Sequence, residues 1–124
     1  MFAYLEAVAP DGRVTYLTEG QLRLIHRKSM MAEVAHRPGL VPRTFSSADT
    51  QQMVPGEASE ISFDLLPISA VLREGYKIRL AIAGADAGTF PSLGIVAGET
   101  HTVSIYRSAS RPSRIDIPVA DTAL

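Results

Sequence analysis

Hydrophobic and polar residues alternate with a period of two in four short runs of this chain. The runs cover residues 61–65, 78–82, 103–105 and 115–119. Successive side chains of a strand point to opposite faces of a sheet, so each run is expected to bury one face and expose the other. This pattern is typical of antiparallel sheets that pack on one side.

The N-terminal third predicts three further strands, at residues 2–8, 14–18 and 21–27. A Pro-Asp-Gly turn at residues 10–12 separates the first two strands, because proline fixes φ and glycine accepts a positive φ. The total is about seven short strands joined by turns. Such a pattern favours an all-β fold, namely an antiparallel jelly-roll or galactose-binding-like β-sandwich.

The connections between these strands differ in kind. Residues 29–54 show little periodicity and are expected to cross between sheets, as long connections of Greek keys and jelly rolls do. Two short helical turns are predicted within the fold. One lies at residues 30–35 and the other at 68–74, with Ser69 as its N-cap and Gly75 as its stop.

Length and charge narrow the class of protein. The 124 residues suit one domain over residues 1–124. Twelve basic and thirteen acidic residues give a net charge of −1, so no nucleic-acid partner is expected. No stretch approaches the roughly 20 apolar residues of a membrane span, so no membrane partner is expected either. The N-terminal residues lack the features of a signal peptide, and a cytoplasmic location is expected.

Motifs that would make this chain an enzyme are missing from its sequence. It has no Gly-x-Ser-x-Gly nucleophile elbow, no phosphate-binding glycine loop and no dinucleotide fingerprint, so no catalytic and no cofactor-binding residue is predicted. The lack of cysteine removes thiolate zinc sites and cysteine nucleophiles. None of His26, His36 and His101 has a second ligand at metal-binding spacing, so no metal site is predicted.

A Ser-His-Asp triad can be drawn on paper from Ser46 or Ser47, Asp49 and His26. Triads are defined by geometry, and the spacing of these residues does not support one. The interpretation that we favour is that Ser46-Ser47 followed by Asp49 makes a local turn capped by a side chain. The carboxylates that would be needed for glycoside hydrolysis lie near turns or on the solvent side of a strand. These are Glu57, Glu60, Asp64 and Glu74.

Residues 72–80 read Leu-Arg-Glu-Gly-Tyr-Lys-Ile-Arg-Leu, and they are one of several stretches whose order along the chain, taken together, carries a common resemblance. The chain resembles the C-terminal domain of X-Pro dipeptidyl-peptidases and cocaine-esterase-like serine hydrolases, which usually carry Phe-x-x-Gly-His-Arg-Ile-Arg-Leu here. Tyr76 and Lys77 replace the family's usual His and Arg. The other stretches follow the family's order over nearly the whole chain. They are residues 4–8, 10–13, 17–20, 22–23, 54–57, 61–65, 90–91, 101–106, 112–115 and 118–119.

The resemblance implies a parent protein with a Ser-His-Asp triad in a separate α/β-hydrolase domain, cleaving esters, amides or X-Pro dipeptides. No residue of that triad maps onto this chain. The chain would then be a non-catalytic structural domain that packs on the catalytic domain and supports it. The family's domain begins with additional strands, so this chain is expected to be N-terminally incomplete. The alternative is a free-standing lectin-like or oligomerising sandwich, although the lack of tryptophan weakens a sugar-binding role.

A sandwich without its first strands is expected to expose apolar surface and unpaired backbone groups. We therefore predict a homo-oligomer, joined at sheet edges near the strand at residues 2–8 or through the glycine-rich loop at 84–98. The candidate domain or subunit interface consists of Phe2, Tyr4, Phe90 and Pro91. In the competing outcome, residues 29–54 fold back over the exposed edge and leave a monomer.

Overall fold

A computed structural model describes residues 1–30, 40–90 and 102–120 of the chain. It divides into two compact units, Met1–Ser92 and Leu93–Leu124, which are described separately here. The single domain over residues 1–124 stays a prediction.

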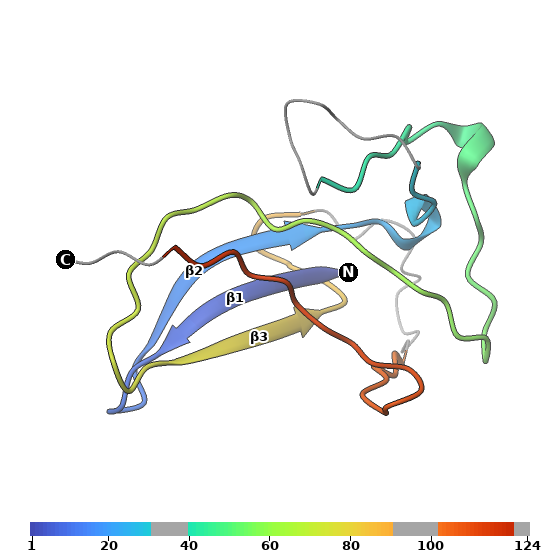
Figure 1. Cartoon of the computed structure of the whole chain (residues 1–124). Helices are drawn as coiled ribbons and strands as arrows, with labels where there is room; N and C mark the ends of the chain where they lie inside the picture. The colour runs from blue at the N-terminus through green and yellow to red at the C-terminus, as the bar shows by residue number, and fades with distance from the viewer. Residues whose placement is uncertain (31–39, 91–101, 121–124) are drawn as a thin grey trace. The chain divides into compact units, whose positions relative to one another are not determined.

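The first unit contains a three-stranded antiparallel sheet (Figure 1). Its strands are β1 (Phe2–Val8), β2 (Val14–Gln21) and β3 (Lys77–Ala83), in the order β2-β1-β3. The only helical elements of the described residues are two 3-10 turns, η1 (Leu24–His26) and η2 (Ser47–Asp49). The predicted all-β antiparallel class is confirmed.

β1 is the central strand of the sheet. It pairs with β2 on one side and with β3 on the other along its whole length. β1 itself therefore offers no free edge for assembly, because its backbone groups are used within the sheet, and assembly at sheet edges near it or through the loop at 84–98 stays a prediction.

The hairpin that joins β1 and β2 forms as its turn residues predict. Gly12 has a φ of +86°, which a side chain would disfavour. The backbone amide of Gly12 donates to the carbonyl of Ala9 at 2.9 Å, and the Ala9 amide donates to the carbonyl of Arg13 at 2.9 Å. The Asp11 carboxylate accepts from the Arg13 amide at 3.0 Å. A local turn chemistry thus fixes the register at this end of the sheet.

One face of β1 forms the buried side of the sheet. Ala3, Leu5 and Ala7 are all buried there, in alternation with half-buried residues. Pairing places Gly20 opposite Ala3 and Thr18 opposite Leu5, and both of these β2 residues are buried as well. The alternation predicted for residues 2–8 therefore separates an inner from an outer face.

Residues 61–66 run against β2, where Gly20 allows a very close approach (Figure 1). A β-carbon on Gly20 would lie 2.2 Å from the carbonyl oxygen of Asp64. The Leu66 amide donates to the carbonyl of Glu19 at 2.8 Å, and the Thr18 hydroxyl donates to the carbonyl of Leu66 at 2.7 Å. These bonds hold the segment at residues 61–66, which we call the crossing segment, against β2 without forming a regular ladder.

Several predicted strands are wrong, since about seven were expected and three form in the described residues. Residues 61–65 form no ladder, and the chain is bonded to β2 only at the next residue, Leu66, through the Thr18 hydroxyl and one backbone bond. Residues 103–105 and 115–119 are extended without a ladder partner among the residues that the structure describes. Alternation shows only that an extended segment has one apolar and one polar face. Whether a second strand pairs with that segment depends on residues elsewhere in the chain.

The predicted strand at residues 21–27 is also wrong, because β2 ends at Gln21 and η1 follows. The Arg27 guanidinium binds one backbone carbonyl within this turn and another in a segment further along the chain. It donates to the carbonyl of Leu24 at 3.3 Å and to that of Gln52 at 3.1 Å. Side-chain bonds to backbone carbonyls thus replace the ladder that a third strand would have needed.

The predicted helical turn at residues 68–74 is not present. Ile68 and Val71 are exposed, so a helix there would have no apolar surface on which to pack. Gly75, expected to end a helix, instead takes a φ of +82° in the tight turn that leads into β3. The turn predicted at residues 30–35 falls, apart from Met30, outside the described residues.

The outer strand β3 was correctly predicted, but its apolar side is not buried. Ile78, Leu80 and Ile82 are 48%, 39% and 45% exposed. They lie on the same face as Ala3, Leu5 and Ala7, their direct partners on β1. The difference arises because β3 is an edge strand in the described part of the chain.

The described residues of the second unit form a small turn. A single bridge joins Ser108 to Arg111, whose guanidinium lies 5.1 Å from the centre of the Tyr106 ring. The Ser113 hydroxyl donates to the carbonyl of Tyr106 at 2.6 Å. This turn joins the two extended runs of the unit.

The close approach at Gly20 makes a direct test of the fold. Replacement Gly20→Ala should lower the free energy of unfolding by about 1–3 kcal/mol, because the new methyl group overlaps the Asp64 carbonyl. Gly84→Ala is the matched control, since a β-carbon there meets nothing within 4 Å. Urea denaturation of the variants measures both effects. Equal stability of the two variants would contradict this packing.

Candidate functional site

Three of the four residues predicted to form an interface lie together on the outer face of the sheet. Phe2 and Tyr4 project from β1, and their ring centres are 6.5 Å apart with nearly parallel planes. Phe90, which follows β3 in the chain, tilts against Phe2 at 5.0 Å. All three rings are half-buried. We call these three residues the aromatic face; Pro91 lies outside the described residues.

Asp86 fixes this arrangement, although the sequence did not single it out. Its Oδ2 accepts a hydrogen bond from the Tyr4 hydroxyl at 2.7 Å. Its Oδ1 accepts from the backbone amides of Gly88 and Thr89, both at 3.1 Å, and its carbonyl accepts from the Phe90 amide at 3.1 Å. One carboxylate thus folds the loop and ties it to β1. An Asp two residues before a Gly was the available sequence signal, because such residues favour side-chain-capped turns.

The hydrogen bond between Tyr4 and Asp86 shifts both titrations. Donation to the carboxylate raises the pKa of Tyr4 to about 12, since loss of the phenolic proton would place a second negative charge beside Asp86. The Tyr4 hydroxyl and the backbone amides of Gly88 and Thr89 lower the pKa of Asp86. The ionised form of Asp86 is therefore the one that the loop stabilises.

An ion pair flanks the aromatic face. The Arg79 Nε of β3 lies 2.6 Å from the Glu6 Oε2 of β1, and these two residues are direct partners across the sheet. The bond to Glu6 raises the pKa of Arg79. Aromatic side chains beside charged ones form a surface suited to packing against protein, with an apolar centre and a polar rim.

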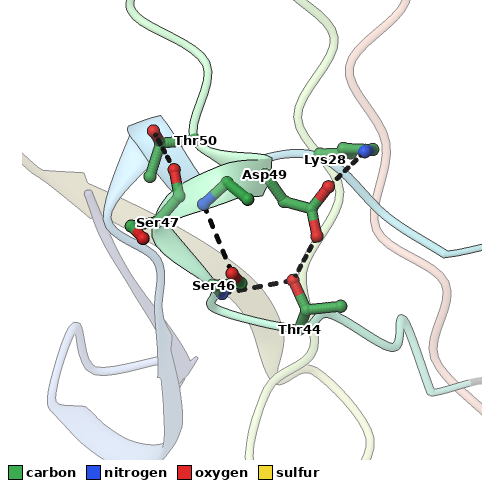
Figure 2. Close-up of polar contacts among 7 residues, drawn as sticks. Lys28, Thr44, Ser46, Ser47, Asp49 and Thr50 are labelled. Atoms are coloured by element: carbon green, nitrogen blue, oxygen red, sulfur yellow. Dashed lines mark hydrogen bonds and ion pairs between the residues drawn. The ribbon is translucent and has the colours of Figure 1, made fainter.

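The triad drawn from the sequence does not form, and Figure 2 shows the partners that Asp49 has instead. The Asp49 carboxylate is bound by the Lys28 ammonium and by the Thr44 hydroxyl, the latter at 2.8 Å. The His26 ring lies edge-on to the Phe45 ring at 5.6 Å. Asp49 thus faces a cation and a hydroxyl and does not orient an imidazole, so no proton relay is built here. The bonds to Lys28 and Thr44 lower the pKa of Asp49.

The predicted capped turn is confirmed at the same place (Figure 2). Ser46 is the N-cap of η2, and its hydroxyl accepts from the Ala48 amide at 3.3 Å. The Thr50 hydroxyl donates to the carbonyl of Ser47 at 2.8 Å. The Ser46 hydroxyl and the Ser47 carbonyl therefore both serve the local turn. His26, expected at the end of a strand, lies in η1.

The remaining candidate residues do not assemble into a site. Asp64 accepts from the Val41 amide at 3.0 Å, while Glu57, Glu60 and Glu74 are exposed. No group of three or more metal-binding side chains occurs in the described residues. His36 and His101 fall outside them. Within the same residues, no helix has the length and hydrophobicity needed to cross a membrane.

A shallow depression of about 330 Å³ lies beside the end of β2. Arg43 reaches into it and donates to the carbonyls of Val41, at 3.1 Å, and of Ser62. Burial lowers the pKa of Arg43, while the nearby Asp64 carboxylate opposes this shift. The depression combines apolar walls with a cation already bound by protein carbonyls and a carboxylate, Asp64, that accepts from the Val41 amide, and no serine or cysteine nucleophile lines it. Its walls are residues 21–22, 40–43, 45 and 63–64.

These features define a class, a β-sheet module whose described residues carry an aromatic face and no catalytic constellation. The family model for the X-Pro dipeptidyl-peptidase C-terminal non-catalytic domain matches residues 1–115. The chain belongs to this family.

Two mycobacterial proteins named "Putative serine esterase" are among its relatives, one from Mycobacterium bovis and one from Mycobacterium tuberculosis. Each is 50% identical over 118 residues, which cover 95% of this chain and 18% of the relative. This chain thus corresponds to less than a fifth of either protein. No solved structure gives a significant match.

The pKa of Tyr4 tests the bond that holds the aromatic face. In Asp86→Asn the pKa of Tyr4 should fall from about 12 toward the ordinary tyrosine value near 10, because the carboxylate is gone. Carbon NMR of the Tyr4 ring should show an ionised phenolate at about pH 11 in the variant and a protonated one in the unchanged chain. Asp11→Asn is the control, since Asp11 caps the hairpin turn instead. An unchanged Tyr4 titration in Asp86→Asn would contradict the contact.

The same bond has a dependence on pH with a defined sign. The folded pKa of Asp86 lies below its unfolded value, so its contribution to stability is present above the unfolded pKa and is lost as the pH falls through the folded one. The folded pKa of Tyr4 lies above its unfolded value, so that contribution is present below about pH 10 and is lost as the pH rises through about 12.

Proposed function

We propose that this chain packs on the α/β-hydrolase domain of a serine hydrolase through its aromatic face and supports that domain structurally. The observation that carries the proposal is the half-buried cluster of Phe2, Tyr4 and Phe90, held on the sheet by Asp86. Clusters of aromatic side chains offer large apolar area at little loss of side-chain entropy, and interfaces between protein domains favour them. Membership in a non-catalytic C-terminal domain family supports the same role.

The design of the cluster also supports a docking role over a purely local one. A loop that only connected two strands would need no aromatic residue on its surface. Here one Asp86 carboxylate oxygen accepts from the Tyr4 hydroxyl and the other accepts from two loop amides. These bonds hold Phe90 against Phe2 in the chain without a partner. Groups that are already ordered lose less entropy on binding, which favours association.

The activity proposed for the parent protein is acyl-ester hydrolysis. The names of the two mycobacterial relatives support an esterase, and the family name supports X-Pro dipeptidyl-peptidase activity as the second candidate. In either case, the nucleophile, base and oxyanion donors belong to another domain. We also propose that the chain self-associates as a homo-oligomer.

The isolated chain is expected to hydrolyse neither p-nitrophenyl esters nor X-Pro-p-nitroanilides above background, because the Ser46 hydroxyl caps η2 and the Asp49 carboxylate is bound by Lys28 and Thr44. Ser46→Ala and Ser47→Ala should leave that background unchanged. Spectrophotometric assays at high protein concentration provide the measurement. A strong esterase signal that either substitution removed would sink the non-catalytic assignment.

The docking proposal predicts different effects of one substitution in two contexts. Phe90→Ser should destabilise the full-length serine hydrolase by about 1–2 kcal/mol more than it destabilises the 124-residue chain, because only the former loses the domain contact. Val71→Ser, at a residue 72% exposed and away from the cluster, is the matched control. Denaturation of both proteins with both variants gives the comparison. Equal effects of Phe90→Ser in the two contexts would show that the aromatic face serves only the loop.

A further inference from the structure

The outer edge of β3 combines backbone groups without a described partner strand and exposed apolar side chains. β3 pairs with β1 on one side, and no strand of the described residues pairs with its other side. An unpaired edge is a template for another strand. Three of its apolar side chains, Ile78, Leu80 and Ile82, are also substantially exposed.

The hydrogen bonds of β1 show which residues of β3 face outward. Met1 and Ala9, at the two ends of β1, both bond toward β2. Backbone groups alternate in direction along an antiparallel strand, so the odd-numbered residues of β1 bond to β2 and the even-numbered ones to β3. The partners of the even residues on β3 are Lys77, Arg79, Ala81 and Ala83.

It follows that the backbone N–H and C=O groups of Ile78, Leu80 and Ile82 point away from the sheet. The same three residues therefore carry both the exposed apolar row and the backbone groups that no described strand pairs. A strand that added to this edge would gain hydrogen bonds and apolar contacts at the same positions.

A second copy of β3 fits this edge in one register. When two antiparallel β3 strands are centred on Leu80, all seven residues of each strand are paired. Ile78 then lies opposite Ile82 of the second copy, and the two Leu80 residues lie opposite each other. Cross-strand apolar pairs of this kind stabilise a sheet.

The charges select the same register. With Leu80 at the centre, Arg79 faces Ala81 and Lys77 faces Ala83, so no two cations are opposed. A register centred on Arg79 would place two guanidinium groups opposite each other, which is destabilising. The ion pair with Glu6 further offsets the charge of Arg79.

We propose that two copies of this chain pair antiparallel through their β3 edges, centred on Leu80, and join their three-stranded sheets into one continuous sheet. The contact is twofold symmetric, so it closes after two copies. This pairing rests on the homo-oligomer proposed above, and it assigns the β3 edge as the surface through which the copies associate. Because one strand pair is small, the dimer forms in a concentration-dependent way.

Cysteine cross-linking tests the register in the 124-residue chain, which contains no cysteine of its own. In Leu80→Cys the two Cα atoms would lie about 5.5 Å apart, within the range for a disulfide bond. In Ile78→Cys they would lie roughly 14 Å apart, because the partner of Ile78 is four residues further along the strand. Mild oxidation followed by non-reducing electrophoresis should give a covalent dimer of Leu80→Cys and not of Ile78→Cys. The double variant with Ile78→Cys and Ile82→Cys should cross-link again.

Light scattering coupled to size exclusion provides a measurement without cysteine. Leu80→Lys should raise the dimer dissociation constant at least about tenfold, because two ammonium groups then face each other at the twofold axis. Val71→Lys, at an exposed residue outside the sheet, should leave the constant unchanged.

Two results would overturn the proposal and can be told apart. A dimer that persists in Leu80→Lys, with no cross-link in Leu80→Cys, would place self-association at another surface. A monomer at all concentrations, with slow exchange of the Ile78, Leu80 and Ile82 amides, would mean that another part of the chain covers the edge. Neither result bears on the docking of the aromatic face, which the two-context Phe90→Ser comparison tests.

Discussion

The central position of β1 is the constraint on which the rest of the structure depends. Because β1 is paired on both sides, its side chains are sorted strictly between two faces. Ala3, Leu5 and Ala7 go inward, while Phe2 and Tyr4 go outward. A shift of one residue in either pairing would exchange these sets and place two aromatic rings in the core. The turn at Gly12 and the close packing at Gly20 hold the register against such a shift.

From this division follows a separation of roles. The inner face holds the crossing segment at residues 61–66 and stabilises the fold. The outer face carries the aromatic cluster, to which Asp86 adds a loop from the far end of the described unit. The polar residues that suggested chemistry in the sequence serve turns and ion pairs in the structure, as the bonds of Asp49 to Lys28 and Thr44 illustrate. The carboxylate that a triad would have needed is thus already bound within the protein.

Sequence reasoning succeeded where the determinant is local. The strand at residues 2–8, the glycine turn that follows it and the Ser46-capped turn depend on neighbours within a few positions, and all three form. It failed for the strands at 61–65, 103–105 and 115–119, because alternation does not say whether a partner strand is available. The aromatic residues were predicted as an interface, but Asp86 was not. Its bond to Tyr4 joins residues 82 positions apart, and only the pairing of β1 with β3 brings them together.

The strand order also carries a consequence for how the chain reaches this structure. β1 and β2 are joined by a short turn, so their hairpin can form on the microsecond timescale. Pairing of β3 with β1 requires closure of the loop at residues 22–76. Closure of a long loop is slow, because the chain loses conformational entropy before it gains any contact. The Tyr4–Asp86 bond requires β3, so the outer aromatic cluster is completed late in folding. Until then the inner face of the hairpin, with Ala3, Leu5 and Ala7, lacks the neighbours Ile82, Leu80 and Ile78 that β3 brings to it.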